Sequence, residues 1–167
     1  MRAILGFSVP VIVLGLVVAS CTQAPAPAPP KADMTAITAQ VDSMNKAFVA
    51  AVAARDTDAM LNFYADDAHI LPPNAPRADG REAVRQVWAE MFRLPGLSLD
   101  AHSTQLVTSE AGDLVIDVGA YTMKMQGPKG KEMEDVGKYV TAMKKTDGGW
   151  KIVVDTFNSD KPMAAGH

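Results

Sequence analysis

Carboxyl and phenol groups recur on the extended, apolar segments in the second half of the chain. In segment 114–126, Asp117 and Tyr121 stand at even spacing, so they share one face of a strand. In segment 132–146, Tyr139 has a comparable place. Such groups exchange protons with a substrate or bind the polar end of a ligand. The face that carries them either lines a cavity or meets solvent, and the sequence favours neither.

The last apolar segment, 150–159, is interrupted by Asp155. A buried carboxylate needs hydrogen-bond partners, and its pKa is often shifted, as at functional sites. We favour a structural pairing for Asp155, with an acid/base role as the alternative. Strict alternation places Asn158, a further candidate, on the face opposite to Asp155, but a β-bulge would shift that register.

Three further candidates precede these segments. Tyr64 follows a predicted short helix, where its ring packs in the core with its hydroxyl at the rim or acts as an acid. His69 titrates near neutral pH, which suits a general base, although a single histidine is more often structural. Trp88 lies on the apolar face of a predicted helix, so core packing is its default. Adjacent Asp66 and Asp67 favour a solvated turn over a catalytic pair.

Two helices are predicted at the start of the folded region. Asp33 is a suitable N-cap, and apolar residues at spacings of three and four follow it to about Arg55. Asp56 caps a second, shorter helix that reaches Phe63. The residues 64–67 are expected to end this helix.

A short strand and a third helix come next. His69–Leu71 predicts a strand that Pro72-Pro73 stops. Asp79 and Glu82 have the spacing of a capping box at the start of the third helix. Pro95-Gly96 ends that helix.

The remaining sequence predicts four strands with short, glycine-containing turns between them. Successive strands joined by short turns form an antiparallel meander. Helices first and strands afterwards indicate an α+β fold, in which the helices cover one face of the sheet. The predicted strands are 97–109, 114–126, 132–146 and 150–159.

Composition limits the classes of partner. The formal net charge is -3 and no basic cluster stands out, which argues against nucleic acid, because that binding depends on Lys and Arg. The sequence has no glycine-rich phosphate loop and no set of metal ligands, so no cofactor is expected. The single cysteine excludes a disulfide within one chain.

That cysteine follows an export signal. Arg2 precedes the apolar run 4–18, which has the length of a signal-peptide core and is short for a membrane span. The small residues Ala19 and Ser20 then precede Cys21, and this order resembles the lipobox of bacterial lipoproteins. The resemblance implies lipidation of Cys21 and anchoring in the cell envelope, in the outer membrane facing the periplasm if the cell is Gram-negative. An ordinary secretory signal with an incidental cysteine is the alternative.

These features predict four parts of the chain. Residues 1–20 are the signal peptide, and residues 21–32 are the lipidated cysteine with an Ala/Pro-rich tether, whose alternating Ala-Pro favours extended polyproline II. Residues 33–161 form the domain, and residues 162–167 form a tail.

The order of elements and several short segments resemble the nuclear transport factor 2-like superfamily, including ketosteroid isomerase and the SnoaL-like cyclases. The matching segments are Phe63–Ala68 with the following Ile-Leu-Pro-Pro, Gly80–Val84, and Gly148–Ile152. The resemblance implies a curved sheet wrapped by three helices into a cone around an apolar cavity. It also implies a homodimer formed through the sheet.

The resemblance does not carry over the chemistry of ketosteroid isomerase. Aligned on Ala65–Ala68, the position of the general base falls on Pro72, and working back through Ala54–Asp56 places the oxyanion tyrosine on Phe48. Neither side chain exchanges a proton, so that reaction, which needs both groups, is not expected.

We therefore expect a membrane-anchored lipoprotein whose cone binds a small, largely apolar ligand. One alternative is an enzyme of isomerase, cyclase or hydrolase type that uses the same cavity. A second alternative is a module that dimerises or docks an envelope partner without a ligand.

Overall fold

The computed structural model describes residues 32–162. The predicted signal peptide, Cys21, all of the tether except Ala32, and all of the C-terminal tail except Pro162 lie outside the described residues. Within residues 32–162, no helix is long and apolar enough to cross a membrane.

Helix α1 (Met34–Ala54) has the predicted bounds. The Asp33 carboxylate accepts a hydrogen bond from the Ala36 amide at 3.0 Å, which satisfies one of the free donors of the first turn. Arg55 ends the helix in the left-handed conformation. Its guanidinium donates to the carbonyl oxygens of Phe92 and Leu94, so the C-terminal ends of α1 and α3 are tied together.

Helix α2 (Thr57–Leu61) begins at the predicted cap, Asp56, and ends two residues earlier than expected. Strand β1 (Tyr64–Leu71) starts where the sequence predicted the end of a helix, so the prediction for 64–67 was wrong. The reason is tertiary: Tyr64 pairs with Ile152 of the last strand, and this pairing overrides the local helical pattern.

Strand β2 (Ala78–Asp79) leads directly into α3 (Gly80–Phe92). Asp79 is the N-cap, but its side chain makes no capping hydrogen bond, so the predicted capping box is not formed. The carboxylate instead lies 2.6 Å from His69 Nδ1 and 2.7 Å from Arg77 Nε.

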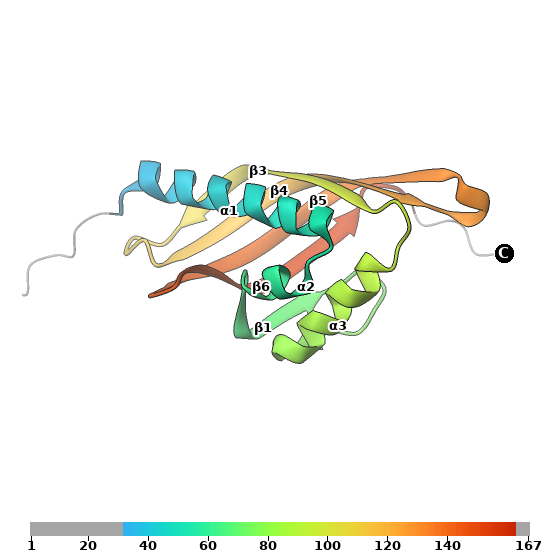
Figure 1. The fold of residues 1–167 in the computed structure, drawn as a ribbon. Helices are drawn as coiled ribbons and strands as arrows, with labels where there is room; N and C mark the ends of the chain where they lie inside the picture. The colour runs from blue at the N-terminus through green and yellow to red at the C-terminus, as the bar shows by residue number, and fades with distance from the viewer. Residues whose placement is uncertain (1–31, 163–167) are drawn as a thin grey trace, which may run out of the picture.

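The sheet contains six strands in the order β2-β1-β6-β5-β4-β3. The last four strands form the predicted antiparallel meander, whereas β1 joins β6 in parallel, so the sheet is mixed. The long β4–β5 hairpin extends beyond its neighbours and turns at the short helix η1 (Figure 1). The bounds are β3 Ser98–Thr108, β4 Leu114–Gln126, η1 Pro128–Gly130, β5 Glu132–Thr146 and β6 Gly149–Ser159.

Two bulges decide which side chains face inward. In β6, Val154 pairs with Ala142 and Ile152 pairs with Met143, which leaves Val153 as an extra residue. Asp155 therefore faces the same side as Ile152, although strict alternation would separate them. Thr104 is the equivalent extra residue in β3.

The helices cover one face of the sheet at its two sides. Helix α1 packs on β3 and α3 packs on β1, with α2 beside α3 (Figure 1). The indole of Trp150 donates to Gln40 on α1 at 2.8 Å, which also ties the helix to β6. Between α1 and α3 the inner face of the sheet remains open to a cavity.

Candidate functional site

The cavity lies between α1, α3 and the inner face of the sheet and has a volume of about 90 Å³. Its walls are mostly apolar, and five of its lining residues are aromatic. The apolar and aromatic lining residues are Phe48, Val52, Trp88, Met91, Leu97, Leu99, Ala101, Tyr121, Met123, Tyr139, Ile152 and Phe157. The other lining residues are Asn45, Thr141 and Asp155.

Asp155 is a buried carboxyl group in this apolar wall, with 7% of its surface exposed. Tyr64 donates a hydrogen bond to Asp155 Oδ2 at 2.7 Å, and the Trp88 indole donates to the Tyr64 hydroxyl at 3.2 Å. Burial raises the pKa of Asp155 to about 6, although the Tyr64 hydrogen bond opposes the rise. Burial and the neighbouring carboxylate raise the pKa of Tyr64 well above its usual value.

A second polar cluster is built around Asp117, which is fully buried. Its Oδ2 accepts hydrogen bonds from the Asn45 amide at 2.9 Å and from the Tyr139 hydroxyl at 3.2 Å. Asn45 also donates to Ser103 Oγ at 2.9 Å. The other carboxylate oxygen, Oδ1, has no partner within the described residues. Burial and Asp117 together raise the pKa of Tyr139.

The two clusters belong to one row across the sheet. Asp117 on β4 pairs with Thr141 on β5, and Thr141 pairs with Asp155 on β6. All three side chains are buried and point to the inner face. With strands about 4.8 Å apart, the two carboxyl groups belong to backbone positions roughly 10 Å apart. The row places two acids in one apolar interior.

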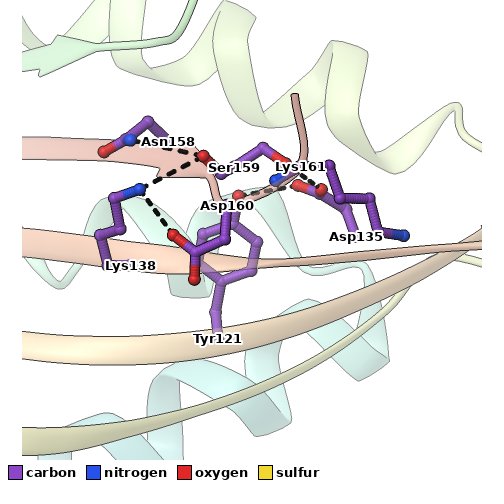
Figure 2. A network of polar contacts seen from close by, with 7 residues as sticks. All are labelled: Tyr121, Asp135, Lys138, Asn158, Ser159, Asp160 and Lys161. Atoms are coloured by element: carbon purple, nitrogen blue, oxygen red, sulfur yellow. Dashed lines mark hydrogen bonds and ion pairs between the residues drawn. The ribbon is translucent and has the colours of Figure 1, made fainter. Parts of the chain in front are cut away.

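Tyr121 joins a third set of contacts near the start of β5 and the end of β6 (Figure 2). Its hydroxyl donates to Asp135 Oδ2 at 2.8 Å, and Ser159 donates to the other oxygen of Asp135 at 2.5 Å. Lys138 forms an ion pair with Asp160 beside them at 2.5 Å. Burial and the Asp135 carboxylate raise the pKa of Tyr121. These contacts fix the Tyr121 ring at the cavity wall.

Two glycines make room for the two tyrosines. Gly119 pairs with Tyr139, and Gly137 pairs with Tyr121, on the inner face of β4 and β5. A Cβ atom on either glycine would collide with the ring of its partner. Each ring therefore lies directly over a glycine, which fixes its position in the cavity wall.

Six of the predicted candidates meet at the cavity. Trp88, Tyr121, Tyr139 and Asp155 line it, and Tyr64 and Asp117 contact lining residues through hydrogen bonds. The inner-face placement of Asp117, Tyr121 and Tyr139 resolves the alternative that the sequence left open. The structural pairing that we favoured for Asp155 is present in its bond with Tyr64.

Two predicted candidates lie away from the cavity. His69 pairs with Asp79, and its side chain is 42% exposed. It alternates with the buried Ala68 and Ile70, so it points outward. Asn158 is exposed, and within residues 32–162 its amide donates only to the neighbouring Ser159 carbonyl, at 3.5 Å. Phe157 faces the cavity, and alternation therefore turns Asn158 away.

Asn45 and Thr141 were missed in the sequence. Asn45 stands four residues after Val41 and three before Phe48, so it is a polar residue on the apolar face of α1. A polar residue at such a position could have been identified from the sequence as a candidate site residue. Thr141 shares a face with Tyr139, but a threonine in a strand is too common to stand out.

The two positions that the sequence comparison assigned to the ketosteroid isomerase groups lie in different places. Phe48 lines the cavity, whereas Pro72 lies along an open groove on the other side of Met91 and Phe157. Met91 and Phe157 contact both spaces, so these two side chains separate the cavity from the groove.

Comparison with known proteins gives the family. The sequence matches the SnoaL-like domain over residues 45–154 and matches no curated protein. The structure is similar to a ketosteroid isomerase-like protein from Erwinia carotovora atroseptica, with a TM-score of 0.66, 19% identity, and coverage of 74% of this chain and 96% of that one. It is also similar to a nuclear transport factor 2-like protein with a cystatin-like fold from Novosphingobium aromaticivorans, with a TM-score of 0.65, 13% identity, and coverage of 78% and 86%.

A nuclear transport factor 2-like superfamily protein from Salmonella enterica serovar Typhimurium has a TM-score of 0.65 at 9% identity, with 79% of this chain and 96% of that one covered. These likenesses confirm the predicted α+β fold. The match over residues 45–154 includes all three helices in whole or in part, and every strand except the end of β6. The chain belongs to the SnoaL-like family.

Proposed function

We propose that the cavity binds a small, largely apolar molecule and that Asp155 receives its polar group. The observation that carries this proposal is a buried carboxyl group in an otherwise apolar wall. Burying a carboxyl group is costly, and Tyr64 engages only one of its oxygens. A ligand group that bonds to the other oxygen would offset part of that cost.

The size of the cavity limits the ligand. Pockets for drug-sized molecules have volumes of roughly 300–1,000 Å³, whereas this cavity has about 90 Å³. A single ring fits this scale better than a steroid. Met91 and Met123 form part of the wall, and flexible methionine side chains adapt to ligands of different shape.

Native mass spectrometry tests the proposal directly. The full-length protein, purified from its own host in mild detergent, is expected to carry an additional small mass that is lost on denaturation. Asp155→Leu is expected to lower the occupancy, while Asp67→Leu, a change at an exposed carboxylate on β1, leaves it unchanged. A bare mass in the native protein would contradict the proposal.

Acid/base catalysis in the same cavity is a second candidate. Its specific support is the pKa of Asp155, which at about 6 lies near the operating pH of most enzymes. The similarity to a protein described as ketosteroid isomerase-like fits such a role. The reaction would have to differ from steroid isomerisation, because Phe48 and Pro72 cannot act as donor and base. Loss of a measured turnover in Asp155→Asn, with ligand binding retained, would support catalysis.

We also propose a homodimer formed through the outer face of the sheet. Aliphatic side chains continue across four strands there, because Val107 pairs with Ile116, Ile116 with Ala142, and Ala142 with Val154. Val107 is 51% exposed, and Val140, two residues before Ala142 on β5, is 37% exposed. A contiguous apolar face of this kind is typical of a protein interface.

Anchoring through Cys21 is a further proposal, supported by the lipobox-like sequence alone. Multiple acyl chains give lasting attachment, whereas a single chain binds a membrane weakly. Cys21→Ser is expected to move the protein from the membrane fraction to the soluble fraction and to remove the lipid mass. Unchanged fractionation and mass would contradict lipidation.

A further inference from the structure

The side-chain N–H donors of the cavity lining, on Asn45 and Trp88, are already engaged, and this restricts the ligand. The Thr141 hydroxyl also lines the cavity, and it can donate as well as accept. The Asn45 amide has two N–H donors, and they go to Ser103 Oγ and to Asp117 Oδ2. Because Asn45 lines the cavity, its amide oxygen is the group left to contact a ligand. That oxygen is an acceptor only.

The three tyrosine hydroxyl groups at the cavity also donate their protons to protein acceptors. Tyr139 lines the cavity and donates its proton to Asp117 Oδ2, so its oxygen is left as an acceptor. Tyr121 also lines the cavity and donates to Asp135. Tyr64 donates to Asp155. None of the three hydroxyl protons is available to a ligand without breaking an existing bond.

Asp155 adds a negative charge to these acceptors. Its Oδ2 receives the Tyr64 hydroxyl, and Oδ1 makes no hydrogen bond within residues 32–162. No lysine, arginine or histidine is among the residues that line the cavity. The carboxylate therefore has no cationic partner in the wall around it.

The aromatic lining has the same preference. Phe48, Trp88, Tyr121, Tyr139 and Phe157 surround the space. The face of an aromatic ring carries partial negative charge, so a ring that presents its face to the space attracts an ammonium group. This preference is independent of the hydrogen-bond inventory.

From the predominance of hydrogen-bond acceptors, including the Asp155 carboxylate, and from the aromatic lining, we infer that the polar group of the ligand is a protonated amine, carried on a small apolar body. The amine donates to Asp155 and to the oxygens of Asn45 and Tyr139, while the body fills the apolar part of the cavity. The inference rests on the proposed function, because it assigns the ligand class for the same cavity. A ketone or a carboxylate would meet mainly acceptors and would leave buried groups unpaired, which lowers affinity.

The carboxyl groups and phenols that face Asp155 set the expected pH dependence. Tyr64 on β1 and Tyr139 on β5 stay protonated, because burial and nearby carboxylates raise their pKa values. Asp117 on β4 adds a second acid behind Tyr139. Burial raises the pKa of Asp155 to about 6, so the carboxylate that would bind an ammonium group is lost below that pH. Amine binding is therefore expected to weaken by about tenfold for each pH unit below 6.

The experiment uses probes of one size and different polar groups. Toluene, benzaldehyde, benzoate and benzylamine are each equilibrated with the full-length protein in lipid nanodiscs at pH 7.5, and empty nanodiscs correct for partition into lipid. Benzylamine is expected to bind at least tenfold more tightly than the other three probes. Equal binding of toluene and benzylamine would overturn the amine inference and leave the apolar cavity in place. No binding of any probe would contradict the proposed function as well.

Two substitutions test whether the amine binds at Asp155. Asp155→Asn keeps the shape of the side chain and removes its charge, so benzylamine is expected to bind this variant no better than toluene does. Toluene binding is expected to be unchanged, which also shows that the cavity is intact. Asp67→Asn changes an exposed carboxylate on β1 and is expected to alter neither benzylamine binding nor toluene binding. Benzylamine binding that is the same in Asp155→Asn, or that is flat between pH 7.5 and 5 in the unaltered protein, would overturn the inference.

Discussion

Tyr139 lies over Gly119, its register partner on β4, with no space for a Cβ atom between them. The same ring donates its hydroxyl proton to Asp117, two residues before that glycine. The absence of a side chain at position 119 therefore sets the height of the Tyr139 ring above the sheet and its distance from a buried acid.

Gly119→Ala is expected to displace the Tyr139 ring and to lower the free energy of unfolding by roughly 1–3 kcal/mol, as overpacking does in well-packed interiors. Urea unfolding of both proteins measures the change. Gly148→Ala is the matched control, because the nearest atom to its Cβ is at 3.8 Å, and it is expected to stay within about 0.5 kcal/mol. Equal effects of the two substitutions would show that the close packing of Tyr139 is unimportant.

Asp155 makes the stability of the fold depend on pH. Because burial raises its pKa from 3.8 to about 6, the folded state binds this proton more tightly than the unfolded state. The stabilisation from the bound proton is complete below pH 3.8 and is lost as pH rises through 6, a change on the order of 3 kcal/mol. Asp155→Asn keeps an acceptor for Tyr64 and does not titrate.

Urea unfolding of the unaltered protein and of Asp155→Asn at several pH values between 3.5 and 7 measures this pH dependence of stability. The difference in free energy of unfolding between Asp155→Asn and the unaltered protein is expected to move in favour of the variant as pH rises. A difference that stays constant over this range would mean that Asp155 does not titrate as described.

Asn45 supports the buried Asp117 from α1. Asn45→Leu removes one of the two donors to Asp117 Oδ2 and leaves Ser103 without its partner, so we expect a loss of about 1–3 kcal/mol in the free energy of unfolding. Ser43→Ala, at an exposed position of α1, is expected to change stability by less than about 0.5 kcal/mol. A neutral Asn45→Leu would indicate that Asp117 finds other donors.

Val140→Lys tests the outer face of the sheet. A charged side chain in the centre of an apolar interface is costly to bury, so the substitution is expected to convert a dimer into a monomer. Light scattering coupled to size-exclusion chromatography measures the mass. Glu132→Lys, at an exposed position near the tip of the β4–β5 hairpin, is the charge control. A monomer already present in the unaltered protein would remove the dimer proposal.

The fold was largely predictable because its signals are local. Asp33 and Asp56 mark two helix starts by their capping chemistry, and the period of two along one strand places Asp117 and Tyr121 on one face. The face of Asp155 could not be derived from alternation, because it depends on the extra residue Val153, which no local pattern identifies. Bulges arise from pairing between strands, and a single strand does not contain that information.

The parts of the site that were missed depend on contacts between distant segments. Tyr64 was expected at a helix end, and its pairing with β6 makes it the first residue of a strand. His69 was a candidate by its chemistry alone, but Asp79 engages it at the surface. Asn45 could have been noticed as a polar residue within an apolar stripe, although its partners Ser103 and Asp117 are assembled only by the sheet.

The parallel pairing of β1 with β6 affects how the chain reaches its folded state. Tyr64 and Asp155 are 91 residues apart in sequence, and β1 has no other long neighbour in the sheet. During synthesis, a chain that ends before residue 149 contains the helices and the β3–β5 meander but lacks both the carboxyl group and the strand on which β1 pairs. Closing a chain segment of this length costs entropy before the contact forms, so such pairings are slow to form. The cavity cannot be completed until β6 has been synthesised, and a chain interrupted before it lacks Asp155 together with the lining residues Ile152 and Phe157.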